Sequence, residues 1–375
     1  VRSWADATIR ISPGTQIFWG ENGAGKTTIL EACIVAATGR SHRAGALREV
    51  VASDAEQAAI SVAVRADGAG PADTLAQSTL GVEIARAGRA KHTLNGTPRS
   101  TTALGQRLRV AAFVPEETGL VVGAPAVRRG LLDRVASQWQ RGYEASLTRY
   151  ERALRQRNRL LKDALEADGA TRRAIAGEMR PWTEMLITTG SEVVAGRLAL
   201  LGALAPALSA AHREVAPSEA PLETHYLSRE QYLPDESARE CAARLAQSFD
   251  QTAEAEGYQG YTLVGPHRDD IAFHVGGSDI APTASRGQQR SLLLALLFAE
   301  IVLLTDEHGH PPVLLLDDAF SELDPQRREH LVARIAALPQ SIITATALED
   351  LAPGLVSRAA AHEIRRGPNG SVVAA

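Results

Sequence analysis

The chain has 375 residues, of which 22% are charged, and its formal net charge is −4. This length allows one large domain or two ordinary ones, each burying a core of its own. The acidic balance excludes the strong basic field of a histone-like protein, so any contact with DNA must be a local patch.

Cysteine use and hydropathy narrow the class further. Cys33 and Cys241 lie far apart and neither belongs to a CxxC pair, which argues against a disulfide scaffold or a thiolate zinc site and favours a reducing cytosol. No signal peptide is expected. The longest apolar run, at 292–304, is interrupted by Glu300. It is shorter than the roughly 20 residues that span a bilayer, so it predicts a buried helix.

Residues 1–115 alternate short strand-like runs with turns. We expect strands at 60–64, 80–85 and 110–114, together with a hairpin at 92–96 whose turn carries an Asn-Gly pair. The runs are interrupted by one strong helical segment. This pattern is typical of an α/β domain.

Long helices are expected in the middle of the chain. Leu147, Leu154 and Leu161 recur every seven residues on one helical stripe, and a similar stripe follows after a break near Gly169. The simplest interpretation is two helices packed antiparallel. Residues 215–235 have no clear period and are interpreted as a connector.

The last third of the chain returns to strand and helix character. A short helix is expected at 238–256, followed by strands at 313–316 and 341–344 with a long helix at 288–305 before them. The sequence therefore predicts an α/β domain that is split by a helical insertion.

Residues 20–27 match the phosphate-binding pattern GxxxxGK[ST] at every fixed position. They follow the apolar run 17–19 and precede a helical segment at 28–37, which is the strand–loop–helix setting that the motif requires. Glycines let backbone N–H groups converge on phosphate, Lys26 reaches the terminal phosphates, and the Thr27 hydroxyl binds Mg²⁺. The alternative is a chance glycine-rich turn.

Residues 313–318 form an apolar run that ends in two carboxylates. This arrangement can place one acid beside Mg²⁺ and another beside an attacking water. We assign Asp317 to the metal and Asp318 to the water. The alternative is a strand that ends in a simple loop cap.

Residues 284–291 open the long helix of the last third with Ser285, Arg286, Gly287 and Gln288. The N-terminus of a helix favours an anion. Because the phosphate-binding loop has a helix of its own, this second tip is expected to meet the phosphate of another copy of the chain. An ordinary serine N-cap remains the alternative.

Together these features resemble the ABC-type heads of DNA-repair ATPases, and in detail the RecF family. The resemblance covers nearly the whole chain. The stretches that carry it, besides the motifs above, are Leu30-Glu31-Ala32, Gly39-Arg40-Ser41-His42-Arg43, Phe113-Val114-Pro115-Glu116, 123–133, 156–162, Gly265-Pro266-His267-Arg268-Asp269-Asp270 and Ser321-Glu322-Leu323-Asp324.

The resemblance implies a head with a mixed P-loop sheet and an antiparallel sheet, divided into an N-terminal part at 1–118 and a C-terminal part at 263–375 by a helical lid at 119–262. It implies slow ATP hydrolysis with Mg²⁺, an ATP-dependent homodimer, and binding to double-stranded and gapped DNA. It further implies partnership with RecR and RecO, indirect action on RecA, a place in recombinational repair, replication and the SOS response, and a cytoplasmic, nucleoid-associated protein without membrane contact.

The candidate residues follow from the motifs and the resemblance together. Catalytic roles are expected for Lys26, Asp317, Asp318 and Thr346, and metal binding for Thr27 and Asp317. The residues expected to bind nucleotide, some of them in trans, are Gly20, Glu21, Asn22, Gly23, Ala24, Gly25, Lys26, Thr27, Thr28, Glu116, Ser285, Arg286, Gly287, Gln288 and Asp324.

Some positions depart from a transporter-type ABC head. The strand at 341–344 is followed by Thr346 where such a head carries a histidine, and RecF-like sequences share this feature, so Thr346 is the expected γ-phosphate sensor. Asp318 replaces the usual glutamate and is one methylene shorter, which predicts slow hydrolysis. Glu116 occupies the place of the usual glutamine. The chain begins at Val1, shortly before the first motif, which leaves open whether a strand precedes it.

Several arginines of the helical insertion are candidates for contacts with DNA phosphates, which would be sensitive to salt and nearly blind to sequence. The alternative is a solvated helix face with ion pairs, and one arginine, Arg157, falls within the apolar stripe and is equally suited to a buried carboxylate. His267 and Arg268 suit nucleotide, DNA, a partner head or a structural turn. The candidate arginines are Arg128, Arg129, Arg155, Arg157, Arg159, Arg172 and Arg173.

Two other functions stay open beside the repair ATPase. One is the ATPase subunit of a membrane transporter, which the absent histidine, the divergent motif at 285–288 and the long insertion disfavour. The other is a scaffold that binds ATP to dimerise without hydrolysing it. A Rad50 or SMC protein is excluded because the insertion is too short for an extended coiled coil and lacks a pair of zinc-hook cysteines.

Overall fold

The computed structural model describes residues 1–65, 77–321, 323–367 and 370–374, without the side chains of Glu116 and Thr118. The chain forms two compact units. Unit 1 comprises Val1–Leu120, Ala210–Glu219 and Ser285–Ala375, and unit 2 comprises Val121–Ser209 and Ala220–Ala284. Residues 263–284, expected in the head, group with unit 2 because their strand pairs with a strand of that unit.

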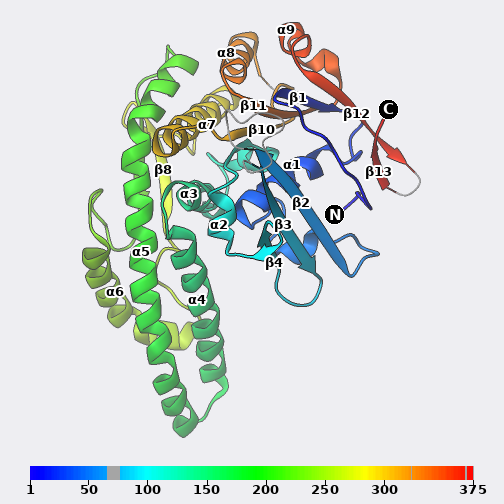
Figure 1. The fold of residues 1–375 in the computed structure, drawn as a ribbon. Coiled ribbons are helices and arrows are strands. Elements are labelled where there is room, and N and C mark those ends of the chain that lie inside the picture. The colour runs from blue at the N-terminus through cyan, green and yellow to red at the C-terminus, as the bar shows by residue number, and fades with distance from the viewer. Residues whose placement is uncertain (66–76, 322, 368–369, 375) are drawn as a thin grey trace. The chain divides into compact units, whose positions relative to one another are not determined.

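Unit 1 contains two sheets (Figure 1). The first has the order β13-β12-β1-β11-β10-β6, with all neighbours parallel except the edge pair β12 and β13. The second is antiparallel, in the order β2-β3-β4-β5. The strands of the mixed sheet are β1 (Gly14–Trp19), β6 (Val110–Phe113), β10 (Val313–Asp317), β11 (Gln340–Ala345), β12 (Ala360–Gly367) and β13 (Gly370–Val373), and those of the antiparallel sheet are β2 (Gln57–Arg65), β3 (Gln77–Ala85), β4 (Lys91–Leu94) and β5 (Thr97–Pro98).

The helix that follows the phosphate loop, α1 (Lys26–Thr38), contacts strands of both sheets. Leu30, Ile34 and Val35 are almost fully buried, as expected for a helix covered on several sides. Cys33 is buried among them, and burial raises the pKa of its thiol to about 11. The other helical segments of unit 1 are α2 (Thr101–Gly105), α7 (Arg286–His308), α8 (Pro325–Ala336), α9 (Pro353–Val356), η1 (Leu47–Val50), η3 (Pro115–Gly119) and η4 (Leu348–Asp350).

The antiparallel sheet follows the expected alternation of buried and exposed side chains. In β3, Leu80, Val82 and Ile84 are buried, each separated by one more exposed residue. The hairpin between β4 and β5 turns at Asn95 and Gly96, whose φ angles are 52° and 76°. Two positive φ angles in succession are typical of a type I′ turn, so the predicted hairpin is confirmed.

Unit 2 is built mainly from long helices. Its elements are α3 (Pro125–Trp139), α4 (Tyr143–Glu166), most of α5 (Gly169–Val215), β7 (Leu222–Leu227), α6 (Ala238–Gln259), β8 (Asp270–Val275) and β9 (Ser278–Asp279). Helices α4 and α5 lie side by side (Figure 1). Ser146 of α4 donates to Glu192 of α5, and Arg157, later in α4, donates to Thr183, earlier in α5. The two helices therefore run antiparallel, and the predicted antiparallel pair is confirmed.

One expected connector contains a strand. Within 215–235, β7 pairs antiparallel with β8 and forms a three-stranded sheet with β9. The interpretation as a connector was wrong because the partner strand of β7 lies more than forty positions further along the chain, where no local pattern reveals the pairing. Only the tertiary pairing defines this strand.

Among the described residues, one helix passes the length and hydropathy test for crossing a membrane. It is α5, whose most apolar window of 18 residues has a mean hydropathy of 1.7, and half of that window is buried in the protein. A buried core helix passes the same test, so the result is weak support for a membrane span.

Candidate functional site

The phosphate loop joins β1 to α1 through three glycines with positive φ. Gly20, Gly23 and Gly25 have φ angles of 147°, 80° and 105°, a region that side chains disfavour. Gly25 is the N-cap of α1 and leaves the first turn of the helix without a side-chain cap. The N–H groups of that turn therefore remain directed at a site for an anion.

The loop is packed closely against the two ends of the chain. A Cβ atom on Gly20 would lie 2.2 Å from the backbone oxygen of Ile364, and one on Gly25 would lie 2.3 Å from Ser371 Oγ. Trp4, itself buried, donates from its indole Nε1 to the Gly25 carbonyl at 2.9 Å. Space and φ both demand glycine at these two positions.

Lys26 is nearly buried at the start of α1. Its Nζ donates to the carbonyl oxygens of Gly20 at 2.5 Å and Glu21 at 2.9 Å. Burial lowers the pKa of Lys26, while the carboxylates of Asp318 and Asp317 act in the opposite direction. The ammonium group thus sits inside the curve of the loop on neutral acceptors that a phosphate oxygen can replace.

Asp317 is the last residue of β10 and is buried at the carboxyl end of the mixed sheet. Its Oδ1 accepts hydrogen bonds from Thr27 Oγ1 at 3.0 Å and from Thr344 Oγ1. Thr344 lies directly opposite Asp317 on β11. The sequence predicted that Thr27 and Asp317 act together, and the structure brings these two side chains into contact.

The pairing of Thr27 with Asp317 fits Mg²⁺ by its chemistry. A hydroxyl and a carboxylate are hard oxygen ligands, and Mg²⁺ usually takes only one or two protein ligands beside water and phosphate. No group of three or more His, Cys, Asp or Glu side chains suited to a metal occurs among the described residues. The two oxygens therefore suit a metal that a nucleotide helps to bind.

Asp318 follows the strand with a φ of 50°, in the left-handed region that aspartate tolerates better than most residues. Its N–H donates to Thr344 at both the carbonyl oxygen (3.2 Å) and Oγ1 (3.1 Å), and its carboxylate accepts from Ser321 Oγ at 3.2 Å. Burial raises the pKa of Asp318, and the Asp317 carboxylate adds to this increase. The partly exposed carboxylate of Asp318 thus follows the buried carboxylate of Asp317 directly in the chain.

The remaining candidates around the loop differ in their exposure to solvent. Glu21 and Asn22 are exposed, whereas Ala24 and Thr28 are buried. Thr346 is exposed one residue beyond β11. The side chain of Glu116, in η3, lies outside the described residues.

Thr344 is the residue that sequence reasoning missed at this site. The signal was present in its position, because it is the last hydroxyl of the expected strand at 341–344. The choice between Thr344 and Thr346 required the strand register, which pairs Asp317 with Thr344.

The tip of α7 carries the second phosphate-binding candidate. Ser285 caps the helix, since its Oγ accepts from Gln288 N at 3.2 Å while Gln288 Oε1 accepts from Ser285 N at 3.0 Å. Both Ser285 and Arg286 are exposed. The tip is thus a well-formed capping box, and its outer surface is open to contact.

Asp324 occupies the corresponding position before α8. It is the N-cap of that helix, accepting from Arg327 N at 3.0 Å, and it forms an ion pair with the Arg327 side chain. The hydrogen bond from the Arg327 backbone keeps the pKa of Asp324 below its usual value, and its side chain adds to the effect. Arg2, near the start of the chain, is bound to the buried Glu31 of α1 behind the loop.

Several arginines suggested for DNA contacts have their guanidinium groups turned inward. Arg157 is buried and donates to Glu256, Thr262 and Thr183. The alternative of a buried carboxylate partner is therefore the correct one for Arg157. Arg129 donates to the backbone oxygen of Asp269 at 2.8 Å.

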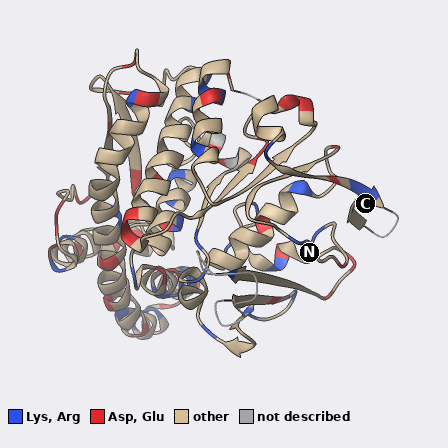
Figure 2. Ribbon diagram, turned by 45° about the horizontal axis from the view of Figure 1, so that its top comes forward, with Lys and Arg blue, Asp and Glu red and all other residues tan. Residues whose placement is uncertain are grey.

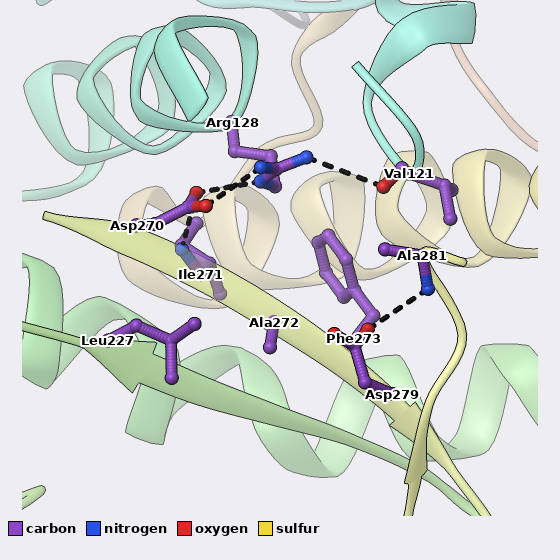
Figure 3. A pocket seen from close by; sticks show the side chains of 9 residues that line it. All are labelled: Val121, Arg128, Leu227, Asp270, Ile271, Ala272, Phe273, Asp279 and Ala281. Atoms are coloured by element: carbon purple, nitrogen blue, oxygen red, sulfur yellow. Dashed lines mark hydrogen bonds and ion pairs between the residues drawn. The ribbon is translucent and has the colours of Figure 1, made fainter. Parts of the chain in front are cut away.

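Arg128 lines a small pocket of unit 2 (Figure 3). Its guanidinium donates to both carboxylate oxygens of Asp270, each at 2.7 Å, and to the carbonyls of Val121 and Gly123. The rest of the lining is mostly apolar, including Phe273. Because the guanidinium is already engaged by protein acceptors, this pocket offers an anion little that is not already paired.

The stretch Gly265–Asp270 is absorbed into a buried polar network of unit 2. Tyr150 Oη lies 2.6 Å from His267 Nδ1, and burial lowers the pKa of His267 to about 4. Tyr226 donates to Asp269 at 2.7 Å, and burial raises the pKa of Asp269 to about 7. Of the roles left open for His267, the structural one agrees best with these contacts.

Arg197 of α5 is the centre of that network. It pairs with both oxygens of Asp133 at 2.9 and 3.0 Å and donates to the Pro266 carbonyl at 2.7 Å. Arg197 is almost fully buried. The network joins α3, α5 and the loop before β8 within unit 2.

Comparison with known proteins gives consistent relatives. A family model described as the RecF/RecN/SMC N terminal domain matches residues 1–353. The DNA replication and repair protein RecF of Symbiobacterium thermophilum is 37% identical over 358 residues, covering 93% of this chain and 90% of that protein.

Two solved structures described as the recombination mediator protein RecF in the RecFOR pathway are also similar. The one named RecF-ATPrS has a TM-score of 0.83 at 25% identity and covers 100% of this chain and 95% of its own. The one named RecF-ATP has a TM-score of 0.80 at 26% identity and covers 100% and 96%. The expected α/β head of the ABC type is confirmed, and the chain belongs to the RecF family of DNA replication and repair proteins.

Proposed function

We propose that this chain is an ATP-dependent recombination mediator that binds ATP and Mg²⁺ in the phosphate loop and closes as a dimer on DNA. The contact between Thr27 and Asp317, at 3.0 Å beside the Lys26 ammonium, carries the proposal. Asp317 comes from a distant part of the chain and meets the neighbouring Lys26 and Thr27 at a glycine loop, which brings a hydroxyl, a carboxylate and a cation together. The solved relatives named with ATP and ATPrS support the same ligand.

In the proposed site, Lys26 leaves the loop carbonyls and binds the terminal phosphates, while the N–H groups at the start of α1 hold the remaining oxygens. Thr27 and Asp317 would hold Mg²⁺, which neutralises charge on the phosphates. Asp318 orients the attacking water, and its raised pKa makes its carboxylate a better proton acceptor than an ordinary aspartate. Thr344 holds Asp317 and the backbone of Asp318 together.

Whether the site hydrolyses ATP is tested by Asp318→Asn. Asparagine tolerates the left-handed backbone of position 318, so the variant removes the charge without straining the turn. Loss of a general base or water-orienting group lowers the rate by about 100-fold or more. Phosphate release that is equal in wild type and variant would instead indicate a scaffold that dimerises without turnover.

The dimer is proposed from the exposed tip at Ser285 and Arg286, which is a capped helix N-terminus open to contact with an anion. A second copy would bring its ATP to that tip, with Glu116 and Thr346 near the bound nucleotide and Asp324 at the seam. Ser285→Arg should abolish the shift from monomer to dimer that ATP with Mg²⁺ produces in sedimentation, and leave ATP binding intact. Loss of ATP binding in the variant would contradict the assignment in trans.

Lys and Arg are dispersed among Asp and Glu over both units (Figure 2). DNA binding is therefore proposed for local groups of exposed basic side chains. On α4, exposed cations recur at spacings of three and four residues, which places them on one helix face. They are Arg152, Arg155, Arg159 and Lys162. Arg159 lies 3.8 Å from Asp163, and both side chains of that pair are exposed.

A second basic stretch, in unit 1, runs from the end of β3 in the antiparallel sheet to the segment before β6. No aspartate or glutamate occurs at 84–115, and the exposed cations of this range are Arg86, Arg89, Lys91, Arg99 and Arg107. Such a run suits the phosphate backbone of DNA in the sequence-independent manner expected of a mediator. With RecO and RecR as partners, the bound dimer would help to load RecA at gaps.

The two basic surfaces can be tested separately. Arg152→Glu with Arg155→Glu, and Arg89→Glu with Arg99→Glu, should each weaken binding to a gapped duplex and reduce its dependence on salt. Arg180→Glu, an exposed arginine of α5 already paired with Glu184, is the control. A pair that behaves as the control does not contact DNA.

A further inference from the structure

A continuous hydrogen-bonded path links the tip of α7 to the start of α8 within one chain. Ser291 Oγ donates to the Gly287 carbonyl at 3.2 Å. Arg327 donates to the same Oγ from Nε at 3.0 Å and from Nη2 at 2.6 Å, and its Nη1 binds the Asp324 carboxylate. Gly287 and Asp324 are both candidates for contact with the nucleotide of a second copy, so the path joins two parts of one surface.

The hydrogen bonds of this path use every donor and acceptor position of the Ser291 hydroxyl. A hydroxyl offers one donor and two acceptor positions, and here the donor serves Gly287 while both acceptor positions serve Arg327. Ser291 is fully buried. A buried serine that is saturated in this way fixes the Arg327 side chain firmly to the first turns of α7.

The position of Arg327 also matters electrostatically. A Cβ atom on Gly287 would lie 3.8 Å from Arg327 Nη2, so the guanidinium sits beside the N-terminal turn of α7. That end of a helix carries partial positive charge and disfavours a cation. Asp324 offsets part of this repulsion in the isolated chain, and the phosphates of a second copy would offset more.

We propose that Arg327 is a positioning residue that binds Ser291 and Asp324 at once, and thereby holds the tip of α7 and the start of α8 in one fixed arrangement for the nucleotide of a second copy. The inference rests on the proposed ATP-dependent dimer. Arginine suits this task because its planar fork carries donors that reach two acceptors in different directions. A lysine at this position could bind only one of them well.

Four proteins test the proposal by sedimentation with ATP and Mg²⁺: Arg327→Met, Ser291→Ala, the double variant, and Arg334→Met as the control. Arg334 lies on the same helix, pairs with Glu214 and lies over the ring of Phe298 of α7, so it controls for the loss of an arginine contact between α8 and α7 away from the tip. The first two should each raise the dimer dissociation constant about tenfold, which corresponds to about 1.4 kcal/mol. ATP affinity of the monomer should stay within about twofold of wild type, because the phosphate loop is untouched.

The double variant separates positioning from general damage. If Arg327 acts through Ser291, the double variant should dimerise about as well as Arg327→Met alone. The effects of substituting two residues in contact are generally not additive. Additive losses, or a loss no larger than that of Arg334→Met, would overturn the proposal. Thermal unfolding of each monomer shows whether folding is intact, and Ser291→Ala carries the test if Arg327→Met is unstable.

Wild-type protein in the same experiment distinguishes failure of the proposed dimer from failure of the role proposed for Arg327. A wild type that remains monomeric with ATP and Mg²⁺ overturns the proposed dimer itself. A wild type that dimerises, alongside an Arg327→Met variant that dimerises equally well, overturns only the role of Arg327.

Discussion

The phosphate loop of unit 1 and the network around Arg197 of unit 2 both contain sequence motifs that resemble the RecF family. The two regions differ in the hydrogen-bond partners of their central cations. Lys26 rests on two neutral loop carbonyls, which are partners that a ligand can replace. Arg197 is held by a carboxylate and a buried carbonyl. A recognisable motif therefore shows that its residues are constrained, and only the partners of each polar atom distinguish ligand binding from support of the fold.

The largest expected effect tests the structural side of this contrast. Arg197→Ala removes a buried guanidinium and leaves the partly buried Asp133 without its ion pair, although Tyr143 still donates to it, which should lower the free energy of unfolding by about 3–5 kcal/mol. Denaturant unfolding measures this. Arg180→Ala is the control, because its ion pair with Glu184 leaves 82% and 64% of the two side chains exposed and should contribute about 1 kcal/mol at most. Equal effects of the two variants would contradict the contrast.

The functional side is tested by Lys26→Ala. Removing the cation should weaken ATP binding about 100-fold, or about 2.7 kcal/mol, and change the free energy of unfolding by only about 1 kcal/mol because two neutral acceptors lose a donor. Titration with a fluorescent ATP analogue and thermal unfolding give the two values. Lys162→Ala, at an exposed lysine, should leave ATP binding unchanged. Unfolding of the Lys26 variant would place this residue with the structural group.

The pH dependence of stability sharpens the contrast, because the pKa of Asp269 is raised to about 7 by burial. In the unfolded chain the pKa of an aspartate is about 3.9. Between these values the folded protein binds more protons than the unfolded one, so its stability is greatest below this window and is lost as the pH rises through it.

Asp269→Asn should remove that loss. Between pH 5 and pH 8 the wild type should lose about 2 kcal/mol or more relative to the variant, measured by denaturant unfolding at each pH. Asp250→Asn, at an exposed acid of α6, is the matched control and should follow the wild type. A wild-type profile no steeper than that of Asp269→Asn would show that the carboxyl stays ionised.

The smallest effect concerns the hydroxyl next to Asp317. Thr344→Val removes one hydrogen bond to Asp317 and one acceptor for the Asp318 backbone, which should weaken Mg²⁺-dependent ATP binding about tenfold. Thr346→Val, at the exposed neighbour, should leave binding intact and slow hydrolysis if it senses the γ-phosphate. The reverse order of effects on binding would assign Thr346, rather than Thr344, to the metal side of the site.

The sequence alone determined the local elements whose signals are short in range. The glycine pattern of 20–27 favours positive φ angles and a helix N-terminus, the apolar run at 313–316 favours a buried strand, and the Asn95-Gly96 turn favours a hairpin. Each depends on backbone sterics or on the spacing of neighbouring residues, so each could be predicted without knowledge of the fold.

Only the tertiary structure decided which distant side chains meet. The register of β10 against β11 selects Thr344 as the partner of Asp317, the pairing with β8 turns an unpatterned segment into β7, and the packing of unit 2 buries Arg157. These outcomes depend on contacts between residues far apart in the chain. Their energies come from burial and from paired polar groups in particular surroundings, which a linear pattern does not encode.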